Sequence, residues 1–207
     1  MLARDVRPAS RSGRFACCAV VLSLTGCLGS PGEARRPGDI DRQILRNTYV
    51  EEGGLVTLVV NTDATRRRLK SDYVPFGLVI ANNGKRALTA NRENLTLTDD
   101  QGRRYPLATV KEVRSLGSRT ANDLRASEFF AAFFVQRLAD RPRVRAVFFP
   151  VLGRGLVADR IELPREAWLI DVIYFPRPDG EPRGRTYELT FAPPELADPV
   201  FVRFRID

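Results

Sequence analysis

The sequence predicts a mainly β domain, an antiparallel β-sandwich with a helical insertion at about residues 108–140. Three observations predict it. Short runs of apolar and β-branched residues recur between residues 40 and 207. Clusters of Asn, Asp, Gly and Pro, which favour turns, separate these runs. Only the middle of the chain carries apolar residues at helical spacing over a longer stretch. Short strands joined by turns are typical of an antiparallel sandwich.

Two kinds of pattern predict the individual strands. Residues 55–60 are a β-branched run, and residues 168–175 are apolar on both faces apart from Asp171, with Pro176 ending the run. The other runs alternate apolar residues with polar or small ones, as a half-buried strand does. The predicted strands cover residues 55–60, 74–80, 94–98, 103–107, 168–175, 187–191 and 200–206. Residues 144–149 are a further, ambiguous strand.

Turn-forming residues connect these strands. Asn82-Asn83-Gly84 predicts a tight turn, because Asn and Gly tolerate positive φ. Residues 99–102 predict a second turn, which pairs residues 94–98 with 103–107 as a hairpin. Asp99 and Asp100 would point in different directions on that turn, so we expect them to be solvated. Gly153-Arg154-Gly155 predicts another turn, since it lacks the rest of any phosphate-binding loop.

Helical spacing begins after residue 107. A short helix is predicted from Ala108 to Leu116 and a longer one from Leu124 to Leu138. Thr120 followed by Asp123 resembles a capping box and predicts a helix start.

Four phenylalanines, Phe129, Phe130, Phe133 and Phe134, form two pairs spaced by four residues on one broad helix face. They are the candidate interaction surface of the domain, for a lipid or a partner. The alternative, which we favour, is that this face packs on an open side of the sandwich, since aromatic residues at helical spacing normally fill a core.

The N-terminus has the layout of a secretory signal. Four arginines precede an uncharged stretch from Phe15 to Leu24, which is far shorter than the roughly 20 residues that span a bilayer as a helix. Leu24-Thr25-Gly26-Cys27 resembles the lipobox of bacterial lipoproteins. The resemblance implies that Cys27 takes a diacylglycerol, that residues 1–26 are cleaved off, and that the new amine is acylated.

This resemblance also implies a location. Several acyl chains hold a protein firmly on a membrane, whereas one does so only marginally. We expect anchoring to the cell membrane or outer membrane, facing the periplasm or exterior. Leu28, rather than Asp, follows the cysteine and favours the outer membrane if the organism is Gram-negative. Residues 27–39 would be the lipidated cysteine and a flexible linker, and residues 40–207 a single domain.

Composition excludes several chemistries. The chain has no His, so the usual Ser-His-Asp, Cys-His and His-metal sites are excluded. Of its three cysteines, two would leave with the signal and Cys27 would be acylated, so we expect neither a disulfide nor thiol chemistry. We expect no cofactor or metal. A carboxylate-based enzyme is an unfavoured alternative, and it would need Glu93, Asp99, Asp100 or Asp171 to converge on a pocket.

The chain is basic, with 33 Lys and Arg against 25 Asp and Glu and a net charge of +8. Most arginines are interleaved with acids, and only residues 66–68 form a run, in a predicted loop. Nucleic acid is therefore not an expected partner. An alternative function is binding of anionic envelope polymers or lipids, through the arginine-rich surface or the Phe129–Phe134 region.

Residues 74–107 and 168–176 resemble the core of immunoglobulin-like domains in secreted bacterial lipoproteins. In both, a strand ends in an Asn-Asn-Gly type turn, and an Asn/Leu-rich strand and a D-x-x-G turn follow. These families imply no common enzymatic activity. The sequence therefore predicts a membrane-anchored envelope lipoprotein that acts as a non-catalytic interaction or assembly module. Its sandwich edges, which can accept an added strand, are the expected surface for an envelope protein partner.

Overall fold

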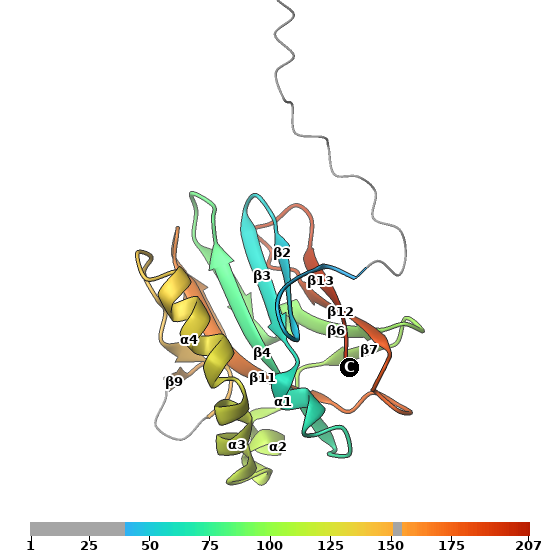
Figure 1. Ribbon diagram of the computed structural model, residues 1–207. Coiled ribbons are helices and arrows are strands. Elements are labelled where there is room, and N and C mark those ends of the chain that lie inside the picture. The colour runs from blue at the N-terminus through green and yellow to red at the C-terminus, as the bar shows by residue number, and fades with distance from the viewer. Residues whose placement is uncertain (1–39, 151–154) are drawn as a thin grey trace, which may run out of the picture. The chain divides into compact units, whose positions relative to one another are not determined.

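The computed structural model describes residues 40–150 and 155–207. The predicted signal peptide, Cys27 and the linker up to residue 39 lie outside these ranges. The described domain is mainly β, with two antiparallel sheets facing one another and helices beside one of them (Figure 1). The predicted β-sandwich with a helical insertion is confirmed.

The first sheet has five antiparallel strands. Its order is β1 (Arg42–Leu45), β2 (Thr48–Glu52), β3 (Val56–Asn61), β4 (Tyr73–Asn82) and β11 (Trp168–Pro176). The β1–β2 hairpin was not predicted individually. Its turn places Asn47 at a φ of 57°, a conformation that Asn tolerates better than most residues.

The second sheet has the order β13 (Val200–Arg205), β12 (Thr186–Phe191), β6 (Leu95–Asp99) and β7 (Arg104–Pro106). Its β6–β7 pairing confirms the predicted hairpin. Aromatic side chains fill the space between the sheets: Phe76 of β4 contacts Phe204 of β13 edge to face, with ring centroids 5.4 Å apart. Such contacts join the two layers into one core.

The prediction that residues 74–80 form a half-buried strand is wrong, because β4 is buried on both faces. Its even-numbered side chains, such as Leu78, lie in the core between the sheets. Val79 and Ala81 lie in a second cluster with Phe130 and Phe134 of α4 (Glu128–Arg137). The helix therefore covers the outer face that the pattern assigned to solvent.

Gly77 permits this close packing. A Cβ at that position would lie 3.0 Å from the Phe130 ring and 3.2 Å from the Cβ of Asn61. A glycine inside a strand often marks such a close approach.

The helical insertion contains α2 (Val110–Ser115), α3 (Arg119–Ala126) and α4. The predicted single helix over residues 124–138 is thus two helices, which meet at Ser127. The buried Ser127 hydroxyl donates a hydrogen bond to the Asp123 carbonyl, a local bond that competes with regular helix geometry.

The predicted helix start at Thr120 is wrong, because Thr120 lies inside α3. The capping box stands instead at Thr109 and Glu112, where α2 begins. The Glu112 amide donates to Thr109 Oγ1 over 3.2 Å, and Glu112 Oε2 accepts from the Thr109 amide over 2.6 Å.

Short strands complete the domain. A two-stranded sheet pairs β5 (Leu88–Asn91) with β10 (Arg160–Leu163), and β8 (Ala146–Val147) pairs in parallel with β9 (Leu156–Val157). The ambiguous strand at residues 144–149 is therefore reduced to two strand residues. Gly153 and Arg154 of the predicted turn lie outside the described residues, and Gly155 has a φ of 72°. A single turn of helix, α1 (Asp63–Arg66), and a 3-10 turn, η1 (Arg92–Asn94), connect other strands.

Candidate functional site

The candidate phenylalanine surface divides into core and exposed residues. Phe130 and Phe134 are buried and belong to the cluster beneath α4, with Phe133 packed against it. Phe129 is 72% exposed. The prediction of one interaction surface made by all four rings is therefore wrong, and the packing alternative holds for most of them. Of the four, only Phe129 is exposed.

A cavity of about 500 Å³ lies between the helical insertion and the edge of β11. We call it the insertion cavity. Its wall is mainly apolar, and its polar side chains are Ser127, Arg143, Arg145 and Asp171. Of the four candidate phenylalanines, Phe130 lines this cavity. This volume falls in the range of about 300–1,000 Å³ that is usual for small-molecule pockets.

Asp171 joins β11 to the segment that follows β8. Its Oδ2 accepts from the Phe148 amide over 2.7 Å, and its Oδ1 accepts from the Val172 amide over 2.7 Å. One backbone donor of β11 and one of the segment after β8 are thereby satisfied. This explains why one carboxylate interrupts the apolar strand.

Burial raises the pKa of Asp171 to about 7, and the two backbone hydrogen bonds and the charge of Arg92 only partly oppose this rise. Near neutral pH the cavity wall therefore carries a carboxyl that can hold or release a proton. Such a group could hydrogen-bond a ligand in either form. Its two oxygens are already engaged by the backbone, so its first role is structural.

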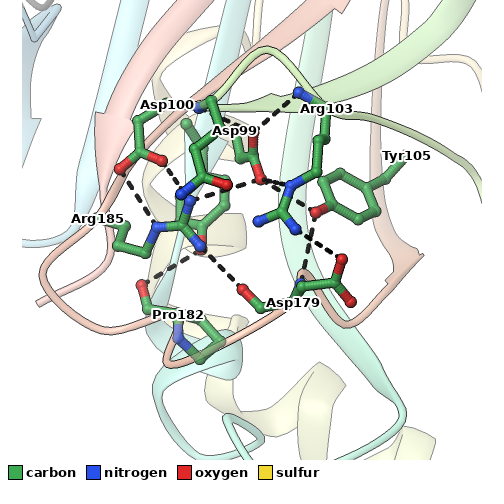
Figure 2. A network of polar contacts seen from close by, with 9 residues as sticks. Asp99, Asp100, Arg103, Tyr105, Asp179, Pro182 and Arg185 are labelled. Atoms are coloured by element: carbon green, nitrogen blue, oxygen red, sulfur yellow. Dashed lines mark hydrogen bonds and ion pairs between the residues drawn. The ribbon is translucent and has the colours of Figure 1, made fainter.

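Asp99 and Asp100 lie at the β6–β7 turn, as predicted, but the expectation that both are solvated is wrong (Figure 2). The Asp99 side chain is fully buried. Its Oδ1 accepts from the amides of Gln101 and Arg103, each over 2.9 Å. Its Oδ2 accepts from Arg103 Nε over 2.8 Å and from the Tyr105 hydroxyl over 3.0 Å.

Burial on its own would raise the pKa of Asp99, but these hydrogen bonds outweigh burial and hold the pKa below its usual range. Asp100 forms an ion pair with Arg185, which lowers the pKa of Asp100. Arg103 and Arg185 also reach the loop before β12, where they bond to the side chain and the carbonyl of Asp179. The network thus clamps two loops together, and its carboxylates are neutralised by arginines.

The acidic residues considered for catalysis have separate surroundings. Asp171 lines the insertion cavity, whereas Glu93, Asp99 and Asp100 are not among its lining residues. Glu93 is exposed in η1. The structure therefore brings together Asp99 and Asp100, through Arg185, but places Asp171 in a different sheet. Within residues 40–150 and 155–207, no group of three or more acidic or cysteine side chains could hold a metal ion.

Two of the predicted edges for strand addition, those of β13 and β11, are partly occupied. The middle of β13 bonds to Asp41, whose amide donates to the Arg203 carbonyl over 2.9 Å. Along β11, the carbonyl of Trp168 accepts from the Val144 amide and that of Tyr174 accepts from the Ala108 amide, each over 2.8 Å. The chain segments on either side of α2–α4 thus occupy part of the long β11 edge.

The proposed lipidation residue, Cys27, lies outside the described residues. Among the helices of the described part of the chain, none is both long and apolar enough to cross a membrane.

Comparisons with known proteins give only distant structural likenesses. No protein-family model matches the sequence, and no curated protein matches it. Among solved structures, the chain is similar to the YjhA protein of Bacillus subtilis, with a TM-score of 0.40 and 12% identity over 76% of this chain and 96% of that one. It is also similar to YcdA of Bacillus subtilis, a candidate lipoprotein, with a TM-score of 0.38 and 12% identity over 75% of this chain. That match spans 38% of the YcdA chain. Likenesses at this level assign no function.

Proposed function

We propose that this chain is an envelope lipoprotein, anchored through acylated Cys27, whose immunoglobulin-like sandwich is a non-catalytic interaction module. The basic segment, the short apolar run and the Leu-Thr-Gly-Cys sequence support the anchor. Two antiparallel sheets with a filled core between them support the sandwich module. The anchor places this domain on the periplasmic or exterior side of a membrane.

Two exposed apolar side chains, Phe129 of α4 and Leu156 of β9, are the observation that carries the interaction role. Phe129 is 72% exposed and directly precedes Phe130, which lines the insertion cavity. Leu156 is 76% exposed and directly follows Gly155, which also lines it. Fully burying one such side chain would contribute about 1.5–3 kcal/mol. An aromatic anchor beside a hollow is a common feature of protein-binding surfaces. The partner expected here is an envelope protein that covers Phe129 and Leu156.

Site-specific photocrosslinking tests the interaction role. A photoreactive phenylalanine analogue is placed in cells at position 129 or 156, and at position 55 as a control. Leu55 is 56% exposed and precedes β3, outside the insertion. We expect one defined crosslinked protein from positions 129 and 156 and none from position 55. Equal products from all three positions, or none from 129 and 156, would overturn this surface.

The anchor is tested separately. Cys27→Ala should abolish incorporation of radiolabelled palmitate and release the chain from membranes after a salt wash. Labelling of the variant at the level of the natural chain would refute acylation at Cys27. This result would leave the crosslinking outcome intact, so the two parts of the proposal fail independently.

A further inference from the structure

A second cavity, of about 460 Å³, lies beside α1 and α3, which pack against one another. It is lined by four arginines, one Asn and one Asp: Arg67, Arg68, Arg119, Arg125, Asn122 and Asp123. We call it the arginine cavity. Four guanidinium groups and one carboxylate give the lining a net charge of about three positive units.

Arg68 forms the fixed part of this wall. Its Nε and Nη2 donate to the two oxygens of Asp123, each over 2.8 Å, and both side chains are nearly buried. The Tyr174 hydroxyl donates to the same carboxylate over 3.3 Å. The Asp123 carboxylate is therefore paired with Arg68 and does not neutralise the charges of the other three arginines.

The other three arginines have no such partner. Arg67, Arg119 and Arg125 are exposed, and their side chains make no ion pair or hydrogen bond with another residue of the described ranges. Arg119, Asn122 and Arg125 follow one another at intervals of three on α3, so they share a face of the helix. Like charges gathered on one surface repel one another unless an anion lies between them.

We propose that the arginine cavity binds a phosphate group. A guanidinium donates two parallel N–H bonds to an oxyanion, and a phosphate has enough oxygens to accept from several guanidinium groups at once. The Asn122 amide adds a further donor at the same place. The phosphate is either free in solution or part of an anionic phospholipid headgroup. This site does not depend on the proposed partner surface at Phe129.

The test compares two triple variants of the full chain. One is Arg67→Gln with Arg119→Gln and Arg125→Gln. The matched control removes the same charge from three exposed arginines away from the cavity lining: Arg104, Arg165 and Arg183. Binding of inorganic phosphate is measured by titration calorimetry. Binding to phosphatidylcholine vesicles with and without phosphatidylglycerol is measured by co-sedimentation. Both variants keep the same N-terminal region, so its contribution to vesicle binding is common to them.

We expect the control variant to bind like the natural chain and the cavity variant to lose binding. Each arginine should contribute about a tenfold change in affinity, as a charge-assisted hydrogen bond does. Loss with inorganic phosphate identifies free phosphate as a ligand, and loss only with phosphatidylglycerol vesicles identifies the headgroup. Equal losses in both variants would indicate a general charge effect and overturn the site. Absence of binding by the natural chain to either probe would overturn it too.

Discussion

The stability of the domain should fall as pH rises through neutrality because of Asp171. Its pKa rises from 3.8 to about 7 in the folded chain. Between these values the folded chain holds a proton that the unfolded chain has released, so folding is penalised increasingly as pH rises. The free energy of unfolding should therefore decrease by about 2–3 kcal/mol between pH 5 and pH 8 through this group.

Asp171→Asn removes this titration while keeping a side chain of nearly the same shape. Its single carbonyl oxygen can accept from Phe148 or Val172 but not from both, so the variant should lose about 1–3 kcal/mol at pH 5. The decrease between pH 5 and pH 8 should then be absent. Asp198→Asn, at an exposed position, is the control and should keep the slope of the natural chain.

Urea unfolding at several pH values measures both quantities. The chain has one tryptophan, Trp168, which is buried in the same strand as Asp171, so its fluorescence reports the transition. The reasoning would be refuted if stability were constant or increased from pH 5 to pH 8. If the stability of the Asp171→Asn variant still decreased from pH 5 to pH 8, the pH dependence would belong to another group.

Four further substitutions test the packing and the polar network. Asp99→Ala should lower the free energy of unfolding by about 3 kcal/mol at pH 7, because it leaves buried donors without an acceptor. Since the pKa of Asp99 is lowered by folding, the loss should shrink below about pH 4, where Asp99 is protonated in the unfolded chain. Phe130→Ala should cost about 3–5 kcal/mol in urea unfolding, whereas Phe129→Ala should stay within about 0.5 kcal/mol. Asp123→Ala should cost about 3–5 kcal/mol in the same assay, because Arg68 keeps a nearly buried charge; equal stabilities of variant and natural chain would contradict the pair's importance.

Local sequence patterns were sufficient to predict the strands that have one face exposed to solvent. β12 and β13 alternate buried and partly exposed residues along most of their length, and both were predicted within one residue. β4 has the same kind of sequence, but α4 covers its second face. A helix more than 40 residues away in the sequence can cover a strand face without changing the alternating pattern of that strand. The glycine at position 77, inside an apolar strand, was the available signal for that close approach.

The roles of the candidate site residues were harder to predict, because they depend on partners that are distant in the sequence. Asp171 stood out as the charged residue of an apolar strand, but its role comes from the Phe148 amide. Asp123 was interpreted as a helix cap, whereas it pairs with Arg68, 55 residues earlier. Thr109 and Glu112 carry the full capping-box pattern and were the better signal for a helix start.

The insertion changes which modes of binding the sandwich can offer. An unpaired strand edge would favour addition of a partner's strand. Here the insertion covers the outer face of β4 with α4, and the chain segments on either side of α2–α4 bond to the edge of β11. β1 and β7 are also edge strands, but they have only four and three residues. We therefore expect recognition mainly by side chains, for which the insertion supplies the exposed Phe129 and, at the arginine cavity, Arg119 and Arg125.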